Sequence, residues 1–352
     1  MNETIQVRPA EAVELPEDPL AFSIEAYKRG WTDGLPVIPP TPERVSAMLA
    51  AGGRDREESL GVLAPRSGVA SVEVVAVNAV LAGCDPQHFQ VLLAAVEAVA
   101  RPEFNLAGVN ATTHPVAQLI LASGPAARAA GIHAGSGVFG PGHRANMCIG
   151  RALRLVQYSV AGARPGAGDM ATFGSPAKIA FCAAEREDAS PWEPYHVDRG
   201  LDPDDFAVTV FPGEAPGNIQ DHASTNAEGV LSTIAGAMAH TGNNNILYPH
   251  KGRPVLAVGV EHAQTIASSG YTRLDAQKFL VEKAYVHRDR LGAEFQASIK
   301  PLRKDLPELM PMVHRPEQIQ VFVTGGPGKH SMFISTFPSS VETTVSWTPK
   351  GR

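Results

Sequence analysis

Cysteine is scarce in this sequence. The 352 residues include only Cys84, Cys148 and Cys182, which lie far apart and form no CxxC pair. Such spacing predicts neither a disulfide framework nor a cysteine-based zinc site. A reducing compartment is therefore the simpler interpretation.

Long apolar runs and long basic runs are also missing. No stretch of about 18 apolar residues occurs, and residues 1–19 are polar and acidic, without the apolar core of a signal peptide. The formal net charge is −6, and no run of Lys and Arg is long enough to neutralise several phosphates. We expect a cytoplasmic protein that binds neither nucleic acids nor membranes.

The composition is that of a globular protein with many ordered loops. Hydrophobic residues make up 44% of the chain and charged residues 19%, which excludes a disordered chain. The 33 glycines and 29 prolines fall in discrete clusters. Clusters of this kind indicate functional loops between elements.

Apolar periodicity predicts an α/β fold of mixed sheets covered by helices. We expect helices over residues 19–30, 41–51, 70–81, 89–99, 144–160, 227–239 and 261–269, and strands over residues 104–112, 116–122, 178–183, 206–211, 255–260 and 318–324. The order of elements after residue 200 matches the order before it, which suggests a diverged duplication. The predicted domains are a flexible arm (1–18), a first lobe (19–200) and a second lobe (201–352).

A Gly-Pro-Gly turn followed by basic or imidazole residues occurs twice, as Gly140-Pro141-Gly142-His143-Arg144 and as Gly326-Pro327-Gly328-Lys329-His330. Glycine lets backbone N–H groups approach a ligand, and the side chains that follow can donate charge-assisted hydrogen bonds. We expect the two turns to meet in one cleft that binds an anion. The predicted ligands there are Arg144, Lys329 and the glycines Gly140, Gly142, Gly326 and Gly328, and the predicted proton carriers are His143 and His330.

Further candidates lie near the first turn and in the early loops. His196 is a third candidate proton carrier, because imidazole titrates near neutral pH. Cys148 is a candidate thiolate, because it lies near the start of a predicted helix and beside cations; an ordinary packed cysteine is the alternative. Asn146, Trp31 and His114 are candidate substrate contacts. Asp169 and Thr172 match no metal motif, so we assign no metal ligands and leave the cofactor open.

Five longer strings stand out in the sequence. They are Gly30-Trp31-Thr32-Asp33-Gly34-Leu35-Pro36-Val37, Ala111-Thr112-Thr113-His114-Pro115, Gly140-Pro141-Gly142-His143-Arg144-Ala145-Asn146, Ala189-Ser190-Pro191-Trp192-Glu193-Pro194 and Gly325-Gly326-Pro327-Gly328-Lys329-His330. Together they resemble a bacterial family associated with proteins that carry a selenocysteine-Gly-Ser-Cys (UGSC) motif. The resemblance covers about residues 19–335 and implies a partnership with a small protein bearing a reactive thiol or selenol. This chain contains no Gly-Ser-Cys, so that group would be supplied in trans.

These observations lead to three hypotheses about function. The first is an enzyme of the lyase or hydrolase type that acts on a small carboxylate-bearing substrate by general acid/base chemistry. The second is the substrate-binding subunit of a thiol or selenol redox system, and the third is a ligand-binding protein without turnover. We also expect a homo-oligomer, because apolar helices exceed what one sheet needs to be covered.

Overall fold

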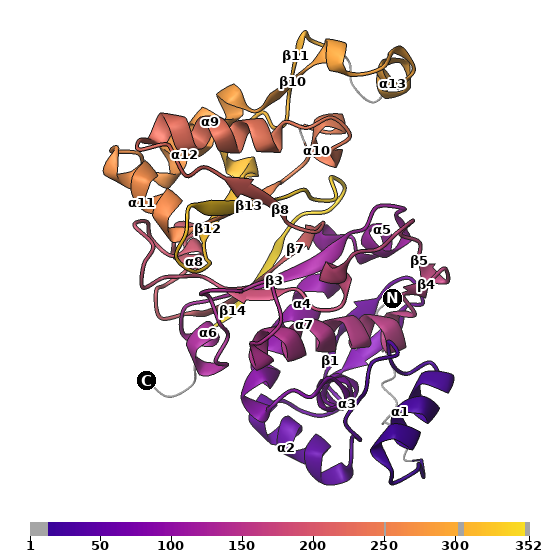
Figure 1. Ribbon diagram of the computed structural model, residues 1–352. Helices are drawn as coiled ribbons and strands as arrows, with labels where there is room; N and C mark the ends of the chain where they lie inside the picture. The colour runs from indigo at the N-terminus through magenta and orange to yellow at the C-terminus, as the bar shows by residue number, and fades with distance from the viewer. Residues whose placement is uncertain (1–12, 250, 302–305, 349–352) are drawn as a thin grey trace, which may run out of the picture.

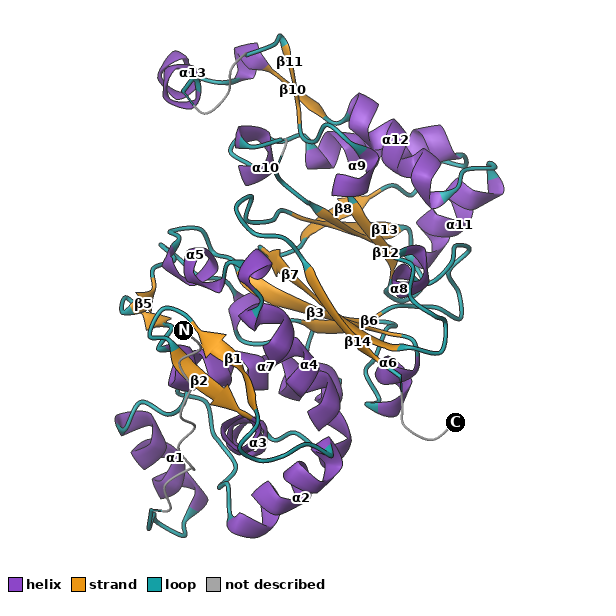
Figure 2. Cartoon of the chain, turned by 180° about the vertical axis from the view of Figure 1, so that it is seen from behind, coloured by secondary structure: helices purple, strands orange, loops and turns teal. Residues whose placement is uncertain are grey.

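Two four-stranded sheets lie face to face at the centre of the molecule, and helices cover the outer face of each (Figures 1 and 2). The computed structural model describes residues 13–249, 251–301 and 306–348. The chain is α/β, as predicted. Most of the predicted N-terminal arm, residues 1–12, lies outside the described residues.

The first sheet has the strand order β14-β7-β3-β6, and the second has the order β12-β9-β13-β8. The first contains β3 (Ala117–Ser123), β6 (Cys182–Ala184), β7 (Phe206–Gly213) and β14 (Thr343–Trp347). The second contains β8 (Gly217–Gln220), β9 (Val255–Val258), β12 (Gln320–Val323) and β13 (His330–Ile334).

Both faces of each sheet are buried, and successive side chains of a strand pack into different layers. In β3, Leu119 and Leu121 pack into an apolar layer between the sheets, whereas Ile120 points to the outer helices. In the second sheet, Phe322 enters the same central layer and Val321 packs under the outer helices. Side chains of a strand point to opposite faces in turn, so apolar residues at every position suit a sheet between two layers.

Helices of the N-terminal half cover the first sheet. Of these, α4 (Phe89–Ala100) and α7 (Arg144–Val156) pack on the sheet, and α2 (Pro42–Gly52) and α3 (Val72–Ala82) pack on these two helices. The remaining helices of this half are α1 (Pro19–Lys28), α5 (Leu106–Ala111) and α6 (Pro125–Ala129). As predicted, α3 and α4 are buried on almost every side. The short pairs β1 (Ser59–Leu63) with β2 (Gly68–Ser71) and β4 (Arg164–Pro165) with β5 (Gly168–Asp169) complete this half.

The second sheet is covered by α9 (Ala227–Met238), α11 (Val260–Ser268) and α12 (Arg273–Lys283). The other elements of this half are α8 (Tyr195–Asp198), α10 (Asn244–Leu247), α13 (Ala293–Ile299) and the antiparallel pair β10 (Tyr285–His287) with β11 (Leu309–Pro311). Figure 1 shows β10, β11 and α13 projecting from the far end. None of the described helices is long and apolar enough to cross a bilayer.

The two sheets share one pattern of strand directions. From β6 to β14, and from β12 to β8, the neighbours are parallel, then antiparallel, then antiparallel. Moreover, β8 follows β7 in the chain but joins the second sheet, and β14 follows β13 but joins the first. The first sheet therefore takes two strands from each side of residue 200. The internal duplication and the two-domain division stay predictions.

Two predicted strands were wrong in whole or in part. Residues 104–112 were predicted as a strand, but Leu106–Ala111 forms α5, because the Asn105 side chain caps a helix by accepting from the Gly108 N–H at 3.2 Å. Residues 178–183 were predicted as one strand, but only Cys182–Ala184 pairs with β3. Pro176 begins a 3-10 turn that ends at Lys178, so the chain joins the sheet later than expected.

Candidate functional site

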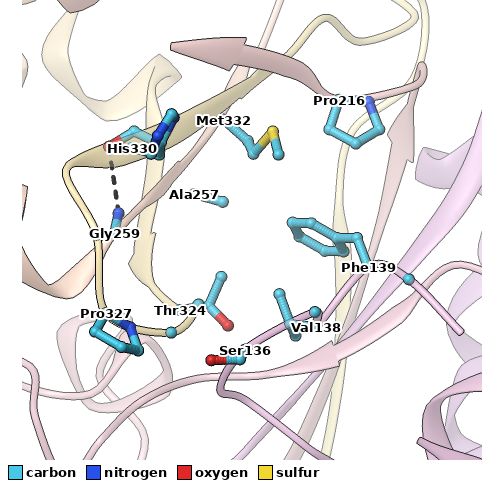
Figure 3. A pocket seen from close by; sticks show the side chains of 16 residues that line it. Ser136, Val138, Phe139, Pro216, Ala257, Gly259, Thr324, Pro327, His330 and Met332 are labelled. Atoms are coloured by element: carbon cyan, nitrogen blue, oxygen red, sulfur yellow. Dashed lines mark hydrogen bonds between the residues drawn. The ribbon is translucent and has the colours of Figure 1, made fainter. Parts of the chain in front are cut away.

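A pocket of about 530 Å³ opens where the carboxyl ends of β9 and β12 meet the loop at residues 136–140 (Figure 3). These two strands are parallel, and their ends are followed by Gly259 and Thr324, which both line the pocket. In α/β sheets, ligands bind preferentially beyond the carboxyl ends of parallel strands. The position of this pocket is therefore that of a binding site.

Both Gly-Pro-Gly segments reach this pocket. Gly140 contributes from the first segment and Gly325 to Gly328 contribute from the second, so the predicted meeting of the two turns is found in the structure. Gly142 is not among the lining residues and is exposed. The second segment therefore makes the larger contribution.

The second loop is held against the first half of the chain by its backbone. The Gly325 N–H donates to the Ala134 carbonyl at 2.8 Å, and the Gly328 N–H donates to Glu261 Oε1 at 2.7 Å. Among the described residues, nothing accepts from the Gly326 N–H. The loop is thus fixed at both ends, with a free donor between them.

Gly326 is required by the close approach of the two loops. A Cβ at this position would lie 2.0 Å from Ser136 Oγ and 2.8 Å from Ser136 Cα. Backbone cannot yield as a flexible side chain can, so any larger residue must push the loops apart.

We therefore expect Gly326→Ala to lower the free energy of unfolding by about 1–3 kcal/mol, the usual cost of overpacking, and to weaken ligand binding. The control is Gly236→Ala, because a Cβ at Gly236, inside α9, meets nothing within 4 Å. That change should stabilise the protein by about 0.5–1 kcal/mol, since alanine is the better helix former. Urea denaturation of both variants checks the prediction, and equal behaviour would contradict it.

Asn146 ties down the loop that forms the other wall. Its side chain is 2% exposed; Oδ1 accepts from the His133 N–H at 2.8 Å, and Nδ2 donates to the carbonyls of His133 at 2.9 Å and Cys182 at 3.1 Å. A buried amide with these partners positions backbone and has little capacity left for a ligand. Asn146, predicted to contact substrate, therefore acts on the pocket through the loop.

Two histidines clamp the same loop from outside. The rings of His133 and His143 stack with centroids 3.5 Å apart and an interplanar angle of 10°. The Nε2 atoms of both rings lie at hydrogen-bond distance from the Ser136 carbonyl, at 3.1 and 3.0 Å. A carbonyl only accepts, so both Nε2 atoms carry hydrogen. His143, a predicted proton carrier, thus has a positioning role and does not line the pocket.

His330 lies at the pocket itself, at the start of β13. Its Nδ1 lies 3.0 Å from Asn218 Oδ1, on the neighbouring strand β8. With that oxygen as the acceptor, Nδ1 carries the hydrogen and Nε2 keeps a free lone pair in the neutral ring. This is the arrangement that a general base requires.

The pocket lining is mostly apolar, and its polar side chains are those of His330, Ser331, Thr324 and Ser136. Figure 3 shows His330, Gly259 and Pro327 on one side, with Phe139 and Pro216 opposite them. Val138, Ala257 and Met332 add further apolar surface. None of the lining residues is Lys, Arg, Asp or Glu.

The two predicted cations lie elsewhere. Arg144 binds Asp85, with Nε 3.1 Å from Oδ2 and Nη2 3.2 Å from Oδ1, and also donates to the Gly83 carbonyl. Lys329 Nζ donates to the His222 carbonyl at 3.2 Å. Arg144 is the first residue of α7, and its side chain reaches the end of α3, which Gly83 caps. Nearness in sequence to a Gly-Pro-Gly turn does not fix the direction of a side chain.

The remaining sequence candidates do not line the pocket either. Burial raises the pKa of the Cys148 thiol in spite of the nearby Arg144, the opposite of the shift expected at a helix start. Burial lowers the pKa of His114, whose ring meets Phe337 edge-on. Trp31 lies under the Arg29 guanidinium, 5.1 Å from its ring centroid. His196 is 1% exposed, and neither ring nitrogen has a hydrogen-bond partner among the described residues.

Glu185 is a buried acid that follows β6. Its Oε2 accepts from the Tyr195 N–H at 2.6 Å, and Oε1 lies 3.7 Å from Arg273 Nη2. Burial raises the pKa of this carboxyl to about 7, only partly opposed by the hydrogen bond and by Arg273. The acid is thus harder to ionise in the folded protein than in the unfolded chain.

A raised carboxyl pKa makes the folded state less stable as pH rises. Between the unfolded pKa, near 4.5, and the folded pKa, about 7, the folded chain holds a proton that the unfolded chain has lost. Glu185 should therefore cost on the order of 3 kcal/mol by pH 8 relative to pH 4. Unfolding free energies of the wild type and of Glu185→Gln at pH 5 and pH 8 test this. We expect the free energy of unfolding of the variant to rise relative to that of the wild type between pH 5 and pH 8. An equal fall in both proteins would refute the prediction.

Asp169 holds two cations and is no metal ligand in this arrangement. It accepts from Arg154 at 2.6 Å and from Lys178 at 2.7 Å, and it is 4% exposed. Within the described part of the chain, no group of three or more His, Cys, Asp and Glu side chains is placed to hold a metal ion.

Sequence analysis missed many residues of the site, among them Ser136, His133 and Asn218. Ser136 and His133 belong to the segment His133-Ala134-Gly135-Ser136-Gly137, whose glycines were a usable signal. Asn218 gave no signal, because it meets His330 only through the pairing of β8 with β13.

The comparisons with known proteins add no relative. No protein-family model matches the chain, and no curated protein is significantly similar to it. The resemblance to the UGSC-associated family therefore stays a prediction that depends on the quoted strings alone.

Proposed function

We propose that this protein is an enzyme that binds a small molecule with an apolar body and one carboxylate or carbonyl oxygen. The pocket at residues 136–140 and 324–332 supports the proposal, because it sets His330 opposite Phe139 and Pro216, and Gly326, whose N–H is free, also lines it. Ligand pockets typically combine an apolar lining with a few well-placed polar groups. The lining contains no cation, so the oxygen is held by neutral donors, as in an oxyanion hole.

In the proposed reaction, His330 moves the proton. Its Nε2 accepts a proton from a water or from a carbon next to the carbonyl group, and returns it to the leaving group in a later step. Gly326 and Ser136 both line the pocket, and in this proposal the Gly326 N–H and the Ser136 hydroxyl stabilise the negative charge that forms on oxygen. Hydrolysis and addition–elimination both fit this set of groups.

A titration with carboxylates of increasing length tests the binding half of the proposal. Acetate, butanoate and hexanoate should bind with rising affinity, by up to roughly 0.8 kcal/mol per buried CH₂, and hexylamine should not bind. Ala257→Leu fills the centre of the pocket and should abolish the binding that strengthens with chain length, whereas Phe139→Ala should weaken only the longer acids. Calorimetry that shows no dependence on chain length, or equal binding of the amine, would overturn it.

The redox-subunit hypothesis is favoured by a separate observation. Burial raises the pKa values of Cys84, Cys148 and Cys182, so none of the three thiols is activated in this chain. A reactive thiol or selenol would then come from a small partner protein. Turnover by the isolated chain supports the first proposal, turnover only after addition of such a partner supports the second, and ligand retention without turnover supports a binding protein.

Self-association and a cytoplasmic location stay predictions. Leu20, Ile24 and Tyr27 lie along one side of α1 and are 67%, 47% and 57% exposed. An apolar stripe of this kind is the surface on which we expect a second copy to pack.

A further inference from the structure

A second, smaller pocket lies at the edge of the first sheet, where α8 meets β14. Its volume is about 210 Å³, and five of its six lining residues carry polar side chains. It shares no residue with the pocket described above. The lining residues are Tyr195, Arg199, Leu201, Glu342, Thr344 and Ser346.

Arg199 is held in place with most of its donors unused. One Nη2 hydrogen bond to Gln320 Oε1 fixes the guanidinium, which also lies over the Tyr195 ring, 5.1 Å from its centroid. No acidic side chain that the structure describes lies within 4.0 Å of it. Guanidinium has five N–H donors in a rigid plane, so the others are available to a ligand in the pocket.

Strand β14 contributes two hydroxyl-bearing residues to the lining of this pocket. Thr344 and Ser346 are two residues apart in β14 and therefore point to the same face, while Val345 between them packs into the helical side of the sheet. Thr344 Oγ1 shares a hydrogen bond with Thr209 at 2.8 Å. Ser346 has no such partner among the described residues and can donate to a bound oxygen.

The charges of the lining residues indicate which class of ligand the pocket binds. Glu342 is already neutralised by Arg253, with Nε 2.6 Å from Oε2 and Nη2 2.5 Å from Oε1. Arg199 is then the charged lining residue without an ionic partner in the described part of the chain, so the lining carries one unbalanced positive charge. We infer that this pocket is a binding site for a small carboxylate, held by Arg199 and Ser346, and separate from the pocket of the proposed reaction. A single negative charge balances the site, whereas a doubly charged phosphate would not.

Titration of the full chain with acetate and propionate, followed by the Nε–Hε resonance of Arg199 in an NMR spectrum, tests the inference. A saturable shift is expected, unchanged in Ala257→Leu, which blocks only the first pocket. In Arg199→Gln, resonances of residues lining the site, such as Ser346, should show an affinity lower by at least about tenfold. Arg290→Gln removes the same charge at an exposed position and should leave the affinity unchanged.

Three results would overturn the inference. The first is the absence of a saturable shift with either carboxylate at constant ionic strength. The second is saturation by inorganic phosphate but not by acetate or propionate, which would assign the site to another anion. The third is an unchanged affinity in Arg199→Gln. Because Ala257→Leu and Arg199→Gln act on different pockets, failure of one proposal leaves the other intact.

Discussion

Replacing His330 by glutamine should lower turnover by about 10²–10⁴-fold, the usual contribution of a general acid or base. Glutamine is neutral and can keep the hydrogen bond to Asn218, so the fold should persist. The variant should also still bind the carboxylate that binds the wild type most tightly in the titration with acetate, butanoate and hexanoate. The reason for the loss is chemical: the amide has no lone pair on nitrogen that could accept a proton. Turnover of that carboxylate or of its ester and amide derivatives, together with thermal unfolding, checks the prediction.

His222→Gln is the matched control. His222 is exposed and meets the His330 ring edge-on, with centroids 5.1 Å apart, but does not line the pocket. We expect turnover within a few-fold of wild type. A ¹⁵N NMR measurement gives a readout that needs no substrate: in its neutral form, the His330 ring should carry its hydrogen on Nδ1. Hydrogen on Nε2, or equal losses in both variants, would argue against His330 as the base.

Much of the fold could be predicted from periodicity, and the errors have local causes. The long apolar helices α3 and α4 and the strand β7 were found because continuous or alternating apolar residues persist over many positions. The segment at Asn105 failed because a single side chain caps a helix there. The exchange of β8 and β14 between the sheets could not be predicted, because which sheet a strand joins depends on long-range packing.

The parts of the site that depend on backbone geometry could be predicted from the sequence. The parts that depend on the direction of a side chain could not. Glycine at Gly326 marks a close approach of two chain segments, and the structure places Ser136 there. Arg144 also stands beside such a turn, but its guanidinium binds Asp85, 59 residues earlier in the chain. Partners at such a distance in sequence cannot be inferred from one chain. The glycine-rich loops therefore indicated where the pocket lies, whereas the positions of the charged side chains around it could be found only from the structure.

Replacing Asp169 by alanine should have the largest effect on stability, a loss of about 3–5 kcal/mol, because it leaves two buried cations without their common partner. Arg154 and Lys178 are 10% and 11% exposed and both contact this carboxylate. The matched control is Asp188→Ala, which removes a carboxylate that is 71% exposed and paired with Arg186. An exposed pair of that kind contributes about 0–1 kcal/mol.

The loss in Asp169→Ala should also depend on pH. Burial lowers the pKa of Lys178 even beside Asp169, and removal of the carboxylate lowers it further. A lysine whose pKa is lower in the folded than in the unfolded state binds fewer protons when folded, so stability rises with pH between the two values. Urea denaturation should therefore show a smaller deficit at pH 10 than at pH 7. A deficit no larger than that of Asp188→Ala, or one that grows with pH, would show that the Asp169 ion pairs do not stabilise the fold in this way.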